Sequence, residues 1–136
     1  MLPRLVGGMV VRFLFICIAG AAGTGARYGI AVGLLRWLGP SFPYGTLTVN
    51  IVGSFLAAAV MELGLSHGAI PEDVRAVLVT GFMGGFTTYS SFNYEMLAYA
   101  HRGSGALAAT YVVATLAGCG AAGVLGFAAA RWVAAG

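Results

Sequence analysis

The chain has 136 residues, of which 60% are hydrophobic and 8% are charged. A typical soluble domain is about 45–50% apolar and about 25% charged, so the composition disfavours both a soluble enzyme and a disordered tail. The net charge of +3 comes without a basic cluster, which gives no reason to expect a nucleic-acid partner.

Four apolar spans predict four transmembrane helices in one domain, residues 1–136. A hydrocarbon core about 30 Å thick needs about 20 residues per helix, so four helices fill a chain of this length. The residues do not alternate between apolar and polar as a β-barrel requires, and helices are therefore expected. The expected spans are residues 13–35, 44–65, 74–100 and 106–130.

The N-terminal segment allows a second interpretation. Arg4 and Arg12 precede an apolar stretch that contains Ala19-Gly20-Ala21, a pattern typical of a signal peptide. The apolar stretch continues past Arg27 to Leu35, however, and we expect a transmembrane helix that the chain keeps.

Small residues at four-residue spacing predict close helix packing, within or between subunits. The first span carries such a face at Ala21, Gly25, Gly29 and Gly33. The two cysteines, Cys17 and Cys119, both lie in apolar runs and are expected to be small core residues rather than a disulfide or a metal pair.

The arginines give a weak indication of orientation. One side of the predicted membrane has Arg4, Arg12, Arg75 and Arg131, and the other has Arg36 and Arg102. The positive-inside rule sets the orientation only where the excess is clear. Two interpretations stay open: a single orientation, or insertion in both orientations followed by pairing with an inverted copy.

Polar residues inside the spans form two short tracks. The second span has Thr46, Asn50 and Ser54 at four-residue spacing, and the fourth has Tyr111, Thr115 and Cys119. Polar groups in a bilayer need partners and often mark the path of a solute. Alternatively, the hydroxyls bond to their own helix and Asn50 bonds to a neighbouring one.

The third span contains an unusual stretch from Gly81 to Glu95. Glycines and β-branched threonines adjoin there, and hydroxyl groups follow on both sides of two aromatic rings, which makes a continuous helix unfavourable. A break would free carbonyls that can hold a cation, and N–H groups and hydroxyls that can meet an anion. Gly81 and Gly85 also form a GxxxG pair, so close helix packing is the alternative.

Aromatic and charged groups in the spans suggest where an ion would pass. Tyr89 and Phe92 share one helical face; ring edges turned to a pore would favour an anion, and core packing is the alternative. Arg27, deep in the first span, would attract anions, snorkel to the interface, or pair with Glu62 or Glu95. The sequence has no nucleophile–base pair and no phosphate loop, so no enzymatic activity is predicted.

Two motifs resemble the Fluc fluoride channels, the CrcB family. They are Pro43-Tyr44-Gly45-Thr46-Leu47 leading to Asn50, and the run from Thr80 to Phe92. The pattern from Gly20 to Tyr28 and the track on the fourth span are similar too. The resemblance implies an all-α membrane protein whose third helix is broken in mid-membrane. It would form an antiparallel, dual-topology homodimer with two pores in the prokaryotic plasma (inner) membrane, passively exporting cytoplasmic fluoride and lowering its toxicity.

The resemblance also implies roles for particular residues. The pore would be lined by Asn50, Tyr89, Ser91, Phe92, Tyr111 and Thr115. Arg27 would lie near an aqueous vestibule, and the backbone carbonyls of Gly84 and Thr87 would hold a structural sodium ion (Na+) at the dimer interface. The implied partners are fluoride, the lipid bilayer and a second copy of the chain, with no nucleic acid. Tyr89 stands where the family usually has Phe, and Cys119 where a hydroxyl residue is common.

Two other functions remain as alternatives: a small four-helix multidrug exporter and a non-conducting membrane subunit. An exporter of that class needs a carboxylate in the middle of its first span, where this chain has Arg27 instead. A fluoride-efflux assay in liposomes distinguishes all three.

Overall fold

The computed structural model describes residues 2–136, with side chains from residue 8 onward, and this part of the chain forms helices without a strand. Three helices are long: α1 (Leu2–Leu38), α2 (Tyr44–Leu65) and α6 (Gly105–Ala135). Between α2 and α6 lies a series of shorter elements, which we call the third segment. It comprises α3 (Glu72–Ala76), the π-helical η1 (Val77–Met83), α4 (Gly84–Phe86) and α5 (Tyr89–His101).

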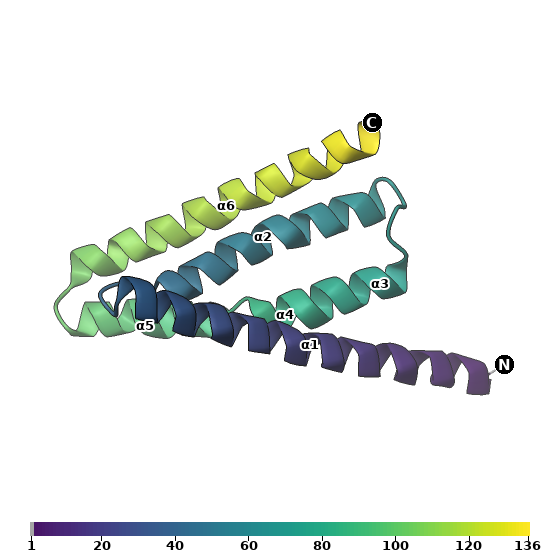
Figure 1. The fold of residues 1–136 in the computed structure, drawn as a ribbon, viewed down its shortest axis with the longest axis horizontal. Coiled ribbons are helices and arrows are strands. Elements are labelled where there is room, and N and C mark those ends of the chain that lie inside the picture. The colour runs from purple at the N-terminus through teal and green to yellow at the C-terminus, as the bar shows by residue number, and fades with distance from the viewer. Residues whose placement is uncertain (1) are drawn as a thin grey trace.

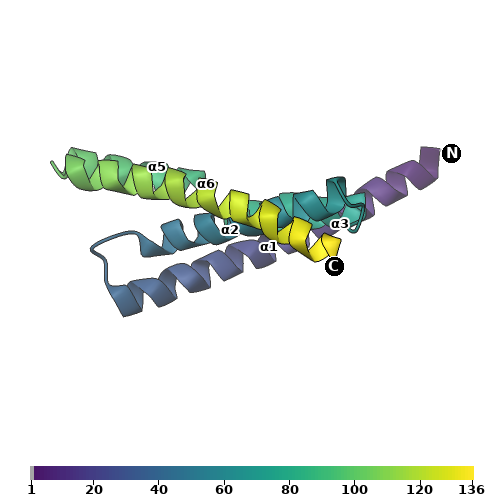
Figure 2. The same ribbon diagram turned by 90° about the horizontal axis from the view of Figure 1, so that it is seen from above.

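The segments run back and forth along one direction, so that both termini lie at the same end of the molecule (Figure 1). The most extensive packing joins α2 to α6, and α1 packs mainly against η1 and α4. At the end away from the termini, the α1–α2 pair and the α5–α6 pair diverge (Figure 2). The break in the third segment lies near the point from which the two pairs separate.

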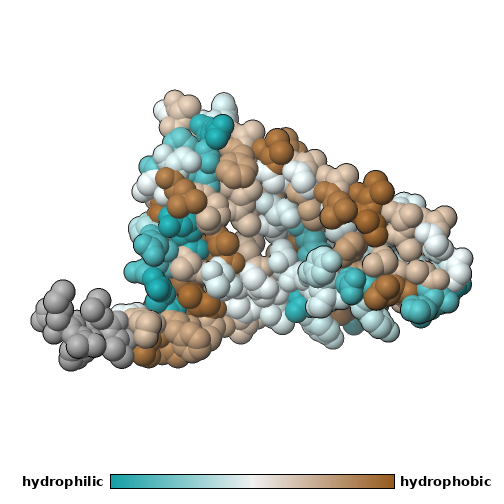
Figure 3. All heavy atoms as spheres, turned by 180° about the vertical axis from the view of Figure 1, so that it is seen from behind, coloured by the Kyte–Doolittle hydropathy of each residue, from teal (hydrophilic) through white to brown (hydrophobic). Residues whose placement is uncertain are grey.

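The outer faces of the helices are suited to lipid. Three helices, α1, α2 and α6, are long and apolar enough to cross a membrane. Trp37 and Trp132, near opposite ends of the molecule, are each 81% exposed, as expected for rings at a membrane interface. Hydrophilic residues gather mainly at the two ends, and hydrophobic and intermediate residues cover much of the middle (Figure 3). The fold is therefore that of a helical membrane protein, in agreement with the fold class expected from composition.

The helix bounds differ from the expected spans at several places. α2 has the expected bounds, whereas α1 and α6 extend beyond residues 13–35 and 106–130. The extension of α1 carries Arg12, whose Nη1 lies 3.2 Å from Asp73 Oδ1 and 3.8 Å from Glu72 Oε1. The expected span 74–100 is divided into short helices, so it does not form one long apolar helix like the other three.

Glycines bring α1 into direct backbone contact with the third segment. A Cβ atom at Gly81 would lie 2.8 Å from the Ile16 carbonyl oxygen, and one at Gly85 would collide with the Gly20 carbonyl. The close packing that Gly81 and Gly85 suggested is thus present, and the break follows it directly. The small-residue face at Gly25, Gly29 and Gly33 is different, because a Cβ added there would meet nothing within 4 Å.

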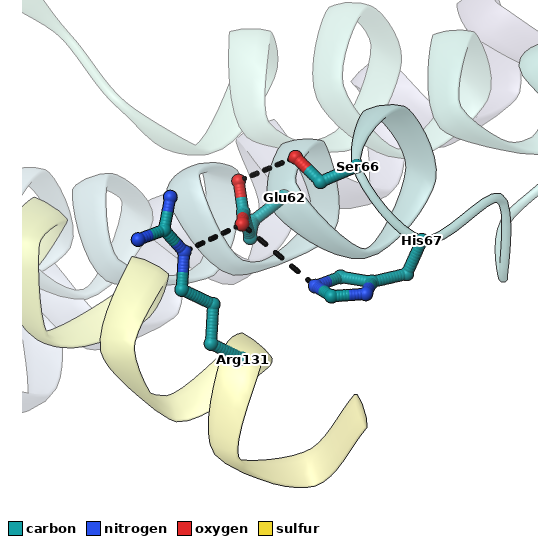
Figure 4. A network of polar contacts seen from close by, with 4 residues as sticks. All are labelled: Glu62, Ser66, His67 and Arg131. Carbon is teal, nitrogen blue, oxygen red and sulfur yellow. Dashed lines mark hydrogen bonds and ion pairs between the residues drawn. The ribbon is translucent and has the colours of Figure 1, made fainter. Parts of the chain in front are cut away.

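A polar cluster joins the end of α2 to the end of α6 (Figure 4). Glu62 is 5% exposed and accepts hydrogen bonds from Arg131 Nε at 2.8 Å and from Ser66 Oγ at 2.9 Å. His67 Nε2 lies 3.8 Å from the same carboxylate. Glu62 is therefore paired with Arg131, and the suggested pairing of Arg27 with Glu62 is wrong.

Candidate functional site

The third segment is broken at two threonines. The helix ends at Phe86, and the next residues are extended, with φ −87° and ψ 161° at Thr87 and φ −153° and ψ 113° at Thr88. β-Branched side chains suit this conformation better than a helix. Thr88 then caps α5, because its Oγ1 accepts a hydrogen bond from the Ser91 N–H at 3.2 Å. Sequence and structure agree on a break, which falls at Thr87 and Thr88, directly after Phe86.

The side chain of Asn50 on α2 holds the extended backbone. Its Oδ1 accepts a hydrogen bond from the Thr88 N–H at 2.8 Å, and its Nδ2 donates one to the Thr88 carbonyl at 3.0 Å. These two bonds satisfy backbone groups that lipid could not. A carboxamide has two N–H bonds, so one donor of Asn50 remains for another acceptor.

Carbonyls on the upstream side of the break receive donors from α1. The Gly85 carbonyl accepts a hydrogen bond from Arg27 Nε at 3.0 Å and one from Thr24 Oγ1 at 3.5 Å. A positive group at the carbonyl end of a helix is electrostatically favourable. Arg27 therefore lies at the break, rather than paired with Glu62 or Glu95.

Two other carbonyls at the break have no such donor. Within residues 2–136, no hydrogen bond from another segment reaches the carbonyls of Gly84 or Thr87. Both residues border an open groove. They are the pair that the family resemblance implied as ligands of a structural sodium ion.

The groove has a volume of about 470 Å³ and lies between α2, the third segment and α6. Six of the predicted site residues border it, together with other polar residues of the two tracks and with apolar side chains. Its lining comprises Asn50, Gly53, Ser54, Ala57, Val79, Met83, Gly84, Thr87, Thr88, Tyr89, Phe92, Thr115, Leu116 and Cys119.

Thr115 is the unusual member of this lining. The residue is 6% exposed, and its Oγ1 has no hydrogen-bond partner among the described residues. Buried hydroxyl groups almost always have partners, because leaving one unpaired is costly. Ser54, by contrast, donates to the Asn50 carbonyl of its own helix at 2.7 Å, as the alternative interpretation of the tracks suggested.

Three aromatic rings pack side by side from the groove to the interior, at tilted or edge-on angles. Phe92, 6% exposed, packs against the fully buried Tyr111 with ring centroids 5.1 Å apart and planes at 64°. Tyr89 is 77% exposed and lies 5.8 Å from Phe92. The two rings of the predicted aromatic pair thus differ in exposure, with Phe92 in the core of the site and Tyr89 at its open side.

A carboxylate joins three helices on the other side of Phe92. Glu95 Oε1 accepts a hydrogen bond from Thr46 Oγ1 at 2.8 Å, and Oε2 accepts one from the Tyr111 hydroxyl at 2.7 Å. Thr46 and Glu95 also border a second hollow of about 180 Å³. We did not expect Glu95 as a site residue, although it is the one acid in residues 74–100 and so could have been identified.

Three predicted site residues lie beside the groove rather than in its lining. Tyr111 is buried behind Phe92, and Arg27 contacts the break from the side of α1. Ser91 Oγ accepts a hydrogen bond from Thr88 Oγ1 at 3.0 Å, so it lies beside the break, in the first turn of α5. The other six predicted site residues border the groove: Asn50, Gly84, Thr87, Tyr89, Phe92 and Thr115.

Comparison with known proteins gives consistent results. Residues 14–127 match a family described as "CrcB-like protein, Camphor Resistance (CrcB)". The chain is 50% identical over 125 residues to a "Fluoride-specific ion channel FluC" of Anaeromyxobacter dehalogenans, covering 92% of this chain and 99% of that protein. It is 45% identical over 125 residues to the protein of the same description in Sorangium cellulosum, covering 92% and 98%. A third relative, in Geobacter metallireducens, is 43% identical over 122 residues.

Proposed function

The chain belongs to the CrcB family, and we propose that it is a passive, fluoride-selective ion channel that exports cytoplasmic fluoride and lowers its toxicity. The relatives are ion channels rather than enzymes, as the sequence analysis expected for this chain. Their bacterial origin and the apolar helices make this a multi-pass protein of the bacterial plasma membrane.

The hydroxyl of Thr115 carries the proposal. It is buried with no hydrogen-bond partner in the part of the chain that the structure describes, and it borders the same groove as Asn50 and Phe92. Fluoride is small and strongly hydrated, and it can leave water only where donors replace its hydration shell. Thr115, the unused N–H of Asn50 and the positive edge of the Phe92 ring supply such groups.

We propose a path that joins the hollow beside Glu95 to the groove beside Thr115. Both oxygens of the Glu95 carboxylate already accept a hydrogen bond, which lowers the charge density that an anion would meet. The path passes the rings of Tyr111 and Phe92 and opens beside Tyr89. Ser91 supports the break and keeps its own O–H as a donor, and the charge of Arg27 raises the potential that an anion meets there.

Replacing Phe92 with Ile is expected to reduce fluoride efflux about tenfold, because a branched aliphatic side chain has no positive edge to replace water. The measurement is fluoride release from liposomes, recorded with a fluoride electrode. Leu97→Ile is the matched control, since Leu97 lies on α5 but is exposed and borders neither hollow. Wild-type liposomes that release no fluoride would reject the channel itself, and unchanged efflux in the Phe92 variant would reject only its role.

We propose that the channel is an antiparallel homodimer of four-span subunits with two pores. The third segment runs the length of the molecule, beside α1 before its break and beside α6 after it, and we take it as the fourth crossing. The open groove and the uncovered small-residue face at Gly25, Gly29 and Gly33 leave surface for a second copy. The weak arginine bias supports insertion in both orientations.

Inverted pairing predicts that a tag on the C-terminus is found on both sides of the membrane in comparable amounts. Protease protection of the tag in sealed vesicles measures this distribution. Adding arginines after Arg131, near the C-terminal end of α6, should shift the tag toward the cytoplasmic side and lower the amount of functional channel. A tag confined to one side in the unmodified protein would contradict inverted pairing.

We further propose that a sodium ion binds at the break, on the symmetry axis of the dimer. The carbonyls of Gly84 and Thr87 are hard oxygen ligands that no donor from another segment of residues 2–136 reaches, and a two-fold copy would double them to four. The described residues hold no cluster of three or more His, Cys, Asp or Glu, so nothing there favours a multivalent ion.

Sodium bound in this way should stabilise the folded dimer, because the ion binds the folded state and not the unfolded one. The melting temperature in detergent is expected to rise with sodium concentration, at constant ionic strength set with N-methyl-D-glucamine. A high-resolution map should show four oxygens at sodium-like distances on the axis. A sodium-independent melting temperature together with a water at that position would rule the ion out.

A further inference from the structure

We propose that Cys119 is a modification site in the ion pathway, and that attaching a small group to its sulfur through a disulfide closes the pathway. The inference rests on the proposed channel function. It makes the conduction of this chain sensitive to thiol-reactive oxidants, such as activated disulfides and thiosulfonates.

The position of Cys119 is the first observation. It lies on α6, one helical turn after Thr115. It is partly exposed and borders the same groove as Thr115. The second observation concerns a different residue. The buried hydroxyl of Thr115, which has no partner among the described residues, indicates a polar ligand or water in that groove. The reactive form of a cysteine is the thiolate, whose charge needs water or polar groups nearby. The groove offers polar groups, those of Thr115 and Asn50.

Cys17 is the natural comparison within the same chain. It is exposed on α1, where its neighbours Phe15 and Ile18 are apolar and exposed as well. In a bilayer that face lies in hydrocarbon, where a thiolate is strongly disfavoured. We therefore expect Cys119 to react in the folded channel and Cys17 to stay unmodified, although Cys17 is the more exposed of the two.

The reaction with methyl methanethiosulfonate balances without another reagent. The Cys119 thiolate attacks the sulfenyl sulfur, the S–S bond of the reagent breaks, and methanesulfinate leaves with the electron pair. The thiol proton passes to solvent, and Cys119 carries an S-methyl disulfide. The added group is apolar and offers no donor, so it both narrows the groove and removes a place where fluoride could be solvated.

The experiment uses purified channel in liposomes and three proteins: wild type, Cys17→Ser and Cys119→Ser. Intact mass before and after treatment counts the adducts, and fluoride efflux is expressed as the ratio of treated to untreated protein. Wild type and Cys17→Ser should each gain one adduct and lose about tenfold in efflux, and dithiothreitol should restore it. Cys119→Ser should gain no adduct and keep its untreated rate.

The outcomes separate this inference from the proposed function. If untreated wild type releases no fluoride, the channel function fails, and the mass measurement still decides whether Cys119 is accessible. If the channel conducts but Cys119 gains no adduct, or gains one without a change in efflux, the inference is wrong and the channel stands. An adduct on Cys17 in the folded protein would also contradict it, since the lipid-facing thiol should be protected.

Discussion

Replacing Asn50 with Leu is expected to destabilise the protein by about 2–6 kcal/mol, because it removes both bonds to Thr88 and leaves two backbone groups unpaired, at about 1–3 kcal/mol each. The loss should appear as a lower melting temperature in detergent and as little or no fluoride efflux. Leu is similar in size to Asn, so a cavity contributes little to the change.

Two further variants identify the cause. Asn50→Asp keeps the acceptor for the Thr88 N–H but sets a carboxylate oxygen against the Thr88 carbonyl, so an intermediate loss is expected. Ser54→Ala, on the same helix, removes only a bond within α2 and should change stability by less than about 0.5 kcal/mol. If Asn50→Leu melts like Ser54→Ala, then Asn50 does not hold the break.

Replacing Tyr111 with Phe is expected to cost about 1–2 kcal/mol of stability, since it deletes the hydroxyl that donates to Glu95 and leaves one carboxylate oxygen with no donor from α6. The ring and its packing against Phe92 remain. Thermal unfolding in detergent measures the change, and fluoride efflux from liposomes should fall in parallel, because the carboxylate regains charge density on the path.

The control is a double-mutant cycle with Glu95→Gln. Gln keeps a hydrogen-bonding group at that place, so Tyr111→Phe should cost clearly less in the Glu95→Gln background than in the wild type. Thr46→Val deletes the other donor to Glu95 and should resemble Tyr111→Phe in its effect on efflux. Equal costs in both backgrounds would show that the Tyr111–Glu95 bond does not carry the effect.

The break in the third segment could be predicted because its cause is local. Neighbouring glycines and β-branched threonines weaken a helix wherever they occur, and Thr87 and Thr88 are extended as that composition indicates. The π-helical turn from Val77 to Met83 could not be predicted in this way, since it accompanies the direct contact of Gly81 with the backbone of α1.

The partners of the buried polar groups could not be predicted from spacing alone. A four-residue track placed Thr46, Asn50 and Ser54 on one face, but each forms a different kind of bond: to Glu95, to the extended backbone and to its own helix. Which donor meets which acceptor depends on how the helices are placed around one another. For the same reason, the sequence did not show that Arg27 donates to the Gly85 carbonyl rather than pairing with an acid.

The long first helix has a consequence for the membrane in which the protein works. Arg12 is held near the start of α3, and Arg36 lies in the last turn of α1 at the opposite end of the molecule. At 1.5 Å per residue, the two charges are about 36 Å apart along the helix, somewhat more than the roughly 30 Å of hydrocarbon in a typical bilayer. In a thinner bilayer α1 has to tilt, but the contact of α1 with the third segment limits that tilt. A bilayer much thicker than the spacing would draw one arginine into hydrocarbon, so the separation of Arg12 and Arg36 sets the greatest membrane thickness that α1 can cross with both charges in water.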